Sequence, residues 1–189
     1  VSLEPYEEKR KNCCVSRSFG ERIKDLQKLE EAVSTYCLNA AEKIRGDDQI
    51  CRGLTVFIRT SPFNKNRKYY SSSQTIEIPI ATNNSIELVK YARKILKGMY
   101  KPGYHYQKAG IILSKLKDAG KNEVNLLTPL MDDRSKTLMK AIDYTNNKYG
   151  KHAITIASAG IHKGWKMRRE HSSKIDTASF DYLPKVSAS

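Results

Sequence analysis

The spacing of apolar residues between positions 14 and 116 constrains the fold more than any other feature. Some stretches alternate between apolar and polar residues, as in half-buried strands, and others repeat every three or four positions, as in amphipathic helices. The predicted strands are 14–23, 50–60, 71–80 and 106–116, and the predicted helices follow the caps Asp25 and Asn83–Ser85, the first ending at Gly46. This β-α-β-β-α-β order predicts an α+β domain with a split βαβ arrangement, in which two helices cover one face of a four-stranded sheet.

Two helices on one side would leave the other face of the sheet bare. Alternation along the predicted strands places polar and basic side chains there: Thr55, Arg59, Ser73, Thr75, Tyr106 and Lys108. Two long runs, 49–76 and 88–117, hold five and eight basic residues without one Asp or Glu. A polar, basic face with few aromatic residues suits a phosphate backbone better than stacked bases.

The net charge of +14 is spread along most of the chain. Residues 14–120 carry 19 basic and 10 acidic side chains, and residues 121–189 carry 12 and 7. Such a spread favours a long polyanion over a small acidic substrate, and a solvated basic surface is the alternative. No apolar run approaches the ~20 residues of a membrane span, so no membrane partner is expected.

The sequence contains no motif typical of a metal site, a disulfide framework or an export signal. The four cysteines have no Cys-x-x-Cys spacing, the histidines are scattered, and residues 1–12 are charged without an apolar core. We therefore expect reduced thiols, no metal site, and a cytoplasmic location.

Three segments carry a resemblance to a known family. CVSRSFGERI (14–23), CRGLTVFIRTSPF (51–63) and YHYQKAGIILS (104–114) resemble the little-finger domain of UmuC-type Y-family DNA polymerases. Residues 4–12 resemble the linker from the thumb, and residues 134–186 are similar to a segment that follows the little finger. The implied divisions are 1–13 (linker), 14–119 (little finger), 120–133 (clamp-binding-like peptide and linker) and 134–189 (C-terminal segment, a small α/β appendage).

The resemblance implies a module of an error-prone translesion polymerase of the SOS response, gripping primer-template or damaged DNA. The DNA-contact candidates are Arg17, Ser18, Thr55, Arg59, Arg67, Lys68, Ser73, Thr75, Tyr106 and Lys108. Two-metal phosphoryl transfer needs clustered carboxylates, and no Asp-x-Asp or Asp-Glu pair stands in a strand setting here. We therefore expect no catalysis and no cofactor in this chain, with the Mg²⁺ site in a catalytic part before Val1.

The segment after the last strand predicts protein partners. Residues 123–127 occupy the place of the family's sliding-clamp peptide, with Glu123 where that peptide has Gln, so weaker clamp binding is expected. Its anchors would be Glu123, Val124, Leu126 and Leu127; the alternative is a plain strand or linker packed on its own domain.

The C-terminal segment predicts a helix at 134–148 and either a short strand or a helical turn at 153–157. With few apolar anchors it either docks on the little finger or orders on a partner. By resemblance, its candidate partners are a UmuD-type dimer and the RecA filament.

Two other functions are compatible with the pattern. An RNA-recognition motif has the same element order, but residues 52–57 match its signature only through Arg-Gly and Phe57. A protein-docking domain with an incidental basic surface is the third hypothesis.

Overall fold

The computed structural model describes residues 9–63, 67–121 and 133–167. Its elements are β1 (Cys13–Ile23), α1 (Leu26–Gly46), β2 (Gln49–Thr60), β3 (Ser71–Thr82), α2 (Ser85–Met99), β4 (Tyr106–Ser114), β5 (Lys117–Asp118), the 3-10 turn η1 (Ala119–Lys121), α3 (Asp133–Tyr149) and the 3-10 turn η2 (Ala157–Ala159). Among these helices, none is both long and apolar enough to span a bilayer.

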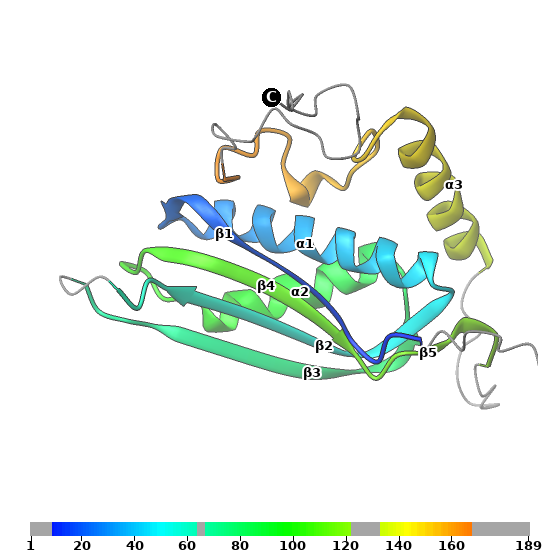
Figure 1. The fold of residues 1–189 in the computed structure, drawn as a ribbon, viewed down its shortest axis with the longest axis horizontal. Coiled ribbons are helices and arrows are strands. Elements are labelled where there is room, and N and C mark those ends of the chain that lie inside the picture. Colours follow the sequence, from blue (N-terminus) through cyan, green and yellow to red (C-terminus); the bar gives the residue numbers. More distant parts are fainter. Residues whose placement is uncertain (1–8, 64–66, 122–132, 168–189) are drawn as a thin grey trace, which may run out of the picture.

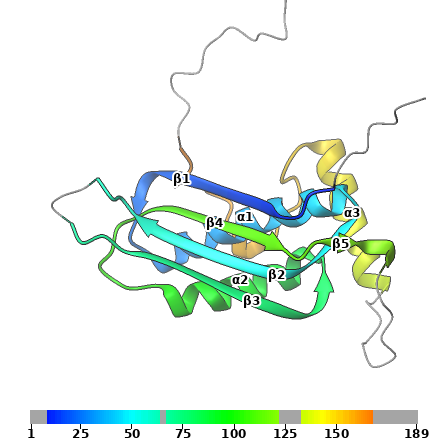
Figure 2. The same ribbon diagram turned by 60° about the horizontal axis from the view of Figure 1, so that its bottom comes forward.

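The sheet has the strand order β1-β4-β2-β3, and every neighbouring pair is antiparallel. Figure 2 shows the four long strands in this order. Helix α1 joins β1 to β2, which run in the same direction on either side of β4, and α2 joins β3 to β4 on either side of β2. The predicted α+β class and the split βαβ order are therefore confirmed.

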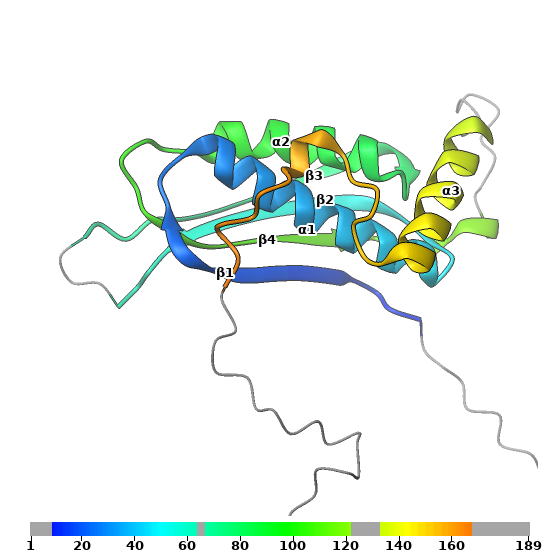
Figure 3. The same cartoon turned by 90° about the horizontal axis from the view of Figure 1, so that it is seen from above.

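Both helices begin where side-chain caps satisfy free backbone donors. The N–H of Gln27 donates to Asp25 Oδ1 at 3.0 Å, and the N–H of Ile86 donates to Asn84 Oδ1 at 2.9 Å. Helix α1 ends at Gly46, as predicted. Figure 3 shows the two helices side by side over one face of the sheet.

The core lies between this helix layer and the sheet. Its fully buried side chains include Leu29, Val33, Ile44, Leu54, Ile58, Ile78, Leu88, Leu96, Ile111 and Leu113. Removing each such aliphatic side chain from water stabilises the fold by about 1.5–3 kcal/mol. The predicted inward residues of β2, α2 and the second half of β4 all belong to this set or to its immediate neighbours.

Tyr106 was predicted on the bare face, and this is wrong. Arg59 pairs with Lys108, whereas Thr60 pairs with Tyr106, so Gln107 is an extra residue in β4. Such a bulge reverses the alternation on its N-terminal side. Tyr106 therefore turns into the core, where it is fully buried.

The described part of the C-terminal segment packs on the outer side of α1 (Figure 1). Trp165, 5% exposed, lies between Phe19 of β1 and Tyr36 of α1, with ring centroids at 6.2 and 5.7 Å in edge-to-face geometry. The N–H of Gly20 donates to the carbonyl oxygen of Trp165 at 3.1 Å. Of the two sequence-based alternatives, docking on the neighbouring domain is the one the structure shows.

The short strand expected at 153–157 is absent from the described residues. Asn146 of α3 accepts from the N–H of Ile154 at 2.8 Å and donates to its carbonyl at 3.1 Å. A side chain thus takes the backbone groups that a strand partner would need. The 3-10 turn η2 covers Ala157–Ala159, so it meets the range of the predicted helical turn at Ala157 alone, and residues 153–156 form neither a strand nor a helical turn.

Candidate nucleic-acid interface

Three rows of side chains form most of the sheet face that the helices do not cover, and a fourth row, Ser114, Gly53 and Glu77, borders them at one end. We call the surface of the three rows the open face; its residues are Cys14, Ser16, Ser18, Thr55, Phe57, Arg59, Ser71, Ser73, Thr75, Lys108, Gly110 and Ile112. Strand register defines the rows, because directly opposed residues of neighbouring strands project to the same side. None of these residues is acidic, and most carry a hydroxyl or a positive charge.

One end of the open face concentrates positive charge. Arg59 of β2 and Lys108 of β4 are directly opposed in the register, with Ser18 and Ser71 at the outer ends of the same row. Like charges directly opposed across strands are destabilising. No carboxylate of a described residue lies within ion-pair distance of either side chain. An anion between them would remove this repulsion.

At the opposite end, beside the open face, one carboxylate lies between two cations. Glu77 of β3 lies 2.6 Å from Lys115 Nζ and 3.2 Å from Arg52 Nε. The hydrogen bond from Lys115 and the charges of both cations lower the pKa of the Glu77 carboxyl. The open face is therefore electrostatically graded, from paired charges near Glu77 to unpaired cations near Arg59.

The middle row of the open face, Ser16, Gly110, Phe57 and Ser73, carries no charged side chain. The ring of Phe57 lies against Gly110, where an added Cβ would come within 2.4 Å of the ring and 2.5 Å of Ser16 Cβ. In the next row, the hydroxyls of Thr55 and Thr75 are 2.8 Å apart and hydrogen-bonded. The centre thus offers hydroxyl groups around a single aromatic ring.

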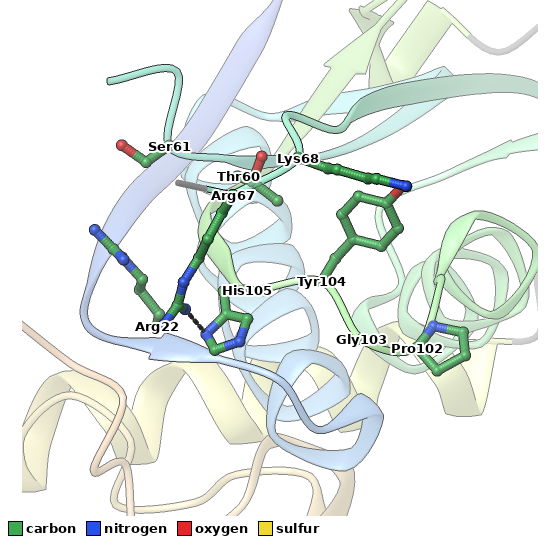
Figure 4. A pocket seen from close by; sticks show the side chains of 9 residues that line it. All are labelled: Arg22, Thr60, Ser61, Arg67, Lys68, Pro102, Gly103, Tyr104 and His105. Carbon is green, nitrogen blue, oxygen red and sulfur yellow. Dashed lines mark hydrogen bonds between the residues drawn. The ribbon is translucent and has the colours of Figure 1, made fainter. Parts of the chain in front are cut away.

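Beyond the basic row the surface deepens into a cavity of about 410 Å³ (Figure 4). Its lining residues are Arg22, Thr60, Ser61, Arg67, Lys68, Pro102, Gly103, Tyr104 and His105. Arg67 Nη1 and His105 Nδ1 form a hydrogen bond in which the guanidinium must donate, so the imidazole accepts. Desolvation and the cations Arg67, Lys24 and Arg22 lower the pKa of His105, which favours the neutral ring. The cavity extends the positive end of the open face.

The predicted DNA-contact residues fall into three groups. Ser18, Thr55, Arg59, Ser73, Thr75 and Lys108 lie on the open face, and Arg67 and Lys68 line the cavity. Tyr106 is in the core, and Arg17 is in register with the inward Ala109, so it lies on the helix side of the edge strand. The clamp-peptide candidates Glu123, Val124, Leu126 and Leu127 are outside the described residues.

The sequence pattern did not assign Arg22 or His105 to this surface. These two residues reach the cavity because the register between β1 and β4 shifts after Ser18, which alternation cannot reveal. The contact between Gly110 and the Phe57 ring was not predicted either. A glycine inside a strand pattern was the signal available, since it often marks a close approach.

Comparison with known sequences defines the class. Residues 10–126 match the impB/mucB/samB family C-terminal domain, and residues 136–186 match a Domain of unknown function (DUF4113). The chain belongs to the impB/mucB/samB family, and the resemblance to UmuC-type polymerases is confirmed.

Two individual relatives align with nearly the whole of this chain. Protein UmuC of Salmonella typhimurium (strain LT2) is 35% identical over 98% of this chain, and Protein ImpB of Salmonella typhimurium is 35% identical over 97%. The chain covers 44% and 43% of these two relatives, so it spans less than half of their length. A solved structure described as a complex of beta-clamp processivity factor and little finger domain of PolIV is 17% identical, with a TM-score of 0.41, and covers 64% of this chain and 93% of that one.

Proposed function

We propose that this chain is the DNA-binding C-terminal module of an error-prone translesion DNA polymerase, and that its open face holds the backbone of primer-template DNA. One observation carries the proposal: Arg59 and Lys108 face each other across β2 and β4 without a carboxylate of a described residue beside them. Phosphate groups are the anions that would offset this repulsion along an extended surface.

The hydroxyls of the open face would complete such an interface. Ser18, Ser73 and Thr75 can donate hydrogen bonds to phosphate oxygens on either side of the basic pair. Backbone contacts of this kind position a duplex without reading its sequence. Tolerance of sequence is what a polymerase that extends past damaged bases needs.

We assign the polymerisation reaction to a longer protein of which this chain is one part, since its relatives are more than twice as long. The described residues hold no cluster of three or more potential metal ligands. We assign the Mg²⁺-binding carboxylates to a part of the polymerase outside this chain, since two-metal phosphoryl transfer requires them. The role of this chain is to hold the DNA for that site.

Residues 123–127 are proposed to tether the polymerase to a sliding clamp, through an extended peptide anchored by Leu126 and Leu127. Replacement of the amide by Glu123 weakens this tether. A UmuD-type dimer and the RecA filament stay proposed partners of residues 134–189, and the cytoplasm the proposed location.

RNA recognition is disfavoured by the geometry of Phe57. Among the described residues it is the sole aromatic side chain of the open face, and its ring lies against Gly110. Base stacking by an RNA-recognition motif uses two or three exposed rings.

The test compares the 189-residue chain with Arg59→Gln, Lys108→Gln and the double variant on primer-template DNA across a salt series. We expect the double variant to bind about tenfold more weakly at low salt, and its log–log salt slope to fall by about one unit per lost phosphate contact. Arg52→Gln is the control for the single variants, because Arg52 lies beside the Glu77 carboxylate, whereas Arg59 and Lys108 have no carboxylate of a described residue within ion-pair distance. If the double variant and the parent chain had equal salt slopes, the open face would not be the surface that binds the DNA backbone.

A further inference from the structure

The C-terminal segment is rich in basic residues, and one of its carboxylates faces inward. Residues 134–167 contain seven basic side chains and one acidic side chain, Asp143, and a further acidic residue, Asp133, begins α3. Arg45 of α1 donates hydrogen bonds to both carboxylate oxygens of Asp143, at 2.6 and 2.7 Å. The negative charge of Asp143 is therefore paired at the contact with the sheet-and-helix domain. After Asp143, residues 144–167 carry four lysines and no acidic side chain of their own.

Two exposed aromatic rings flank one of these cations. Tyr144 and Tyr149 of α3 are 66% and 70% exposed. Lys148 Nζ lies 6.0 Å from the ring centroid of Tyr144 and 5.3 Å from that of Tyr149. Large exposed rings have an unfavourable contact with water, and here they stand beside a positive charge.

Three further lysines follow α3. Lys151 is the second residue after the helix, and the turn in which the Lys166 N–H donates to the Lys163 carbonyl, at 3.0 Å, lies beside Gly20 of β1. Burial, Lys163, Lys166 and Lys151 together lower the pKa of His152, and burial and Lys166 lower the pKa of Lys163. These side chains therefore share one positive potential.

This region is separate from the open face. Figure 1 shows the segment that follows α3 above α1, α3 itself at the right-hand end of α1, and the sheet on the other side of α1. We call it the appendage surface and define it by Tyr144, Lys148, Tyr149, Lys151, Lys163 and Lys166. A duplex lying on the open face would leave it accessible.

We propose that the appendage surface binds single-stranded nucleic acid. Lysines that track a sugar-phosphate backbone, interleaved with exposed rings on which bases stack, are the two parts of a sequence-tolerant single-strand site. An acidic protein would use the lysines but would gain little from the exposed rings. This inference goes beyond the proposed function and does not rest on it.

The experiment measures binding of the 189-residue chain to a labelled oligo-dT of about 12 nucleotides, within the usual range of single-strand site sizes. One variant, Lys148→Gln/Lys151→Gln/Lys163→Gln, removes charge; the other, Tyr144→Ser/Tyr149→Ser, removes the rings. We expect each to weaken oligo-dT binding at least about fivefold, and the lysine variant alone to reduce the salt slope. Both should bind a blunt-ended DNA duplex, which has no single-stranded part, as the parent chain does.

The matched control removes the same charge elsewhere. Lys28→Gln/Lys90→Gln/Lys94→Gln takes three exposed lysines from α1 and α2 and should bind oligo-dT as the parent chain does. Equal losses in this control and in the appendage variant would overturn the proposal, as would unchanged oligo-dT binding in both appendage variants. Poly-glutamate that displaces oligo-dT equally well, with no effect of the tyrosine changes, would instead show an acidic-protein site. Loss through Arg59→Gln/Lys108→Gln alone would assign single strands to the open face.

Discussion

Arg45 of α1 and Asp143 of α3 form a two-pronged ion pair, with Nε–Oδ2 and Nη2–Oδ1 distances of 2.6 and 2.7 Å. The third nitrogen of the guanidinium donates to the Asn83 carbonyl and to Ser85 Oγ, both at 2.7 Å. A single side chain thus joins α1, the start of α2 and α3. The Arg45 side chain is 11% exposed, so these partners take the place of most of the water molecules that would otherwise hydrate the guanidinium.

Asp143→Asn should destabilise the chain by about 1–3 kcal/mol. The change keeps the shape of the side chain but leaves the mostly buried guanidinium of Arg45 without its counter-charge, which is costly where water cannot compensate. Urea unfolding measures the loss of free energy. Trp165, the single tryptophan of the chain, reports whether the segment still docks, because its emission should shift to longer wavelength if it is released.

A surface ion pair serves as the control for this prediction. Lys115→Gln breaks the exposed pair with Glu77 and should leave the unfolding curve nearly unchanged, since such pairs contribute little. If Asp143→Asn were as mild as Lys115→Gln, the contact between α1 and α3 would not hold the segment in place.

Gly110→Ala should destabilise the sheet by about 1–3 kcal/mol, because its Cβ would overlap the Phe57 ring and Ser16 Cβ. Adding Phe57→Ala should recover part of the loss, since the ring is one of the two obstacles. A double-mutant cycle in urea measures this coupling. Strictly additive losses would mean that the ring does not rest on Gly110.

Tyr106→Phe should cost about 1–2 kcal/mol of stability and leave DNA affinity unaltered. The Tyr106 hydroxyl accepts from the N–H of Lys101 at 2.8 Å and donates to its carbonyl at 3.1 Å, so both groups lose a partner. Unfolding and anisotropy on the same samples separate the two effects. A weaker affinity with unchanged stability would return Tyr106 to the DNA-contact residues.

The sequence predicts the element order because each element has a strong local signal. The caps Asp25 and Asn84, and the strict alternation of residues 54–58, act within a few positions of the chain. Irregularities of strand pairing have no such local signal. Gln107 is recognised as an extra residue only when β4 is aligned with its partner strand β2. This one shift explains why Lys108 was placed correctly and Tyr106 was not.

Side-chain pairing over long sequence separations limits the prediction of the remaining parts. The contact of Trp165 with Phe19, and that of Asp143 with Arg45, joins residues about a hundred positions or more apart. Nothing local marks Trp165 as a core residue of the other domain. In the same way, alternation could not show that Arg17 stands opposite the inward Ala109.

The cysteines should divide into one reactive thiol and three protected ones. Cys14 is exposed on the open face, whereas Cys13, Cys37 and Cys51 are buried. Burial raises the pKa of Cys51 to about 12 and that of Cys37 above its usual range, so neither forms a thiolate at neutral pH. Timed alkylation at pH 7 should show a single fast phase that Cys14→Ser abolishes. More than one fast thiol in the folded chain would contradict the burial described.

The most direct test of the open face is an NMR titration of the isotopically labelled chain with a short primer-template duplex. The account predicts that amide shifts follow Ser18, Thr55, Thr75 and Lys108, and extend to Arg67 and His105 at the cavity, while the outer side of α1 stays unchanged. Shifts confined to α1 and α3, with the open face silent, would contradict the central claim.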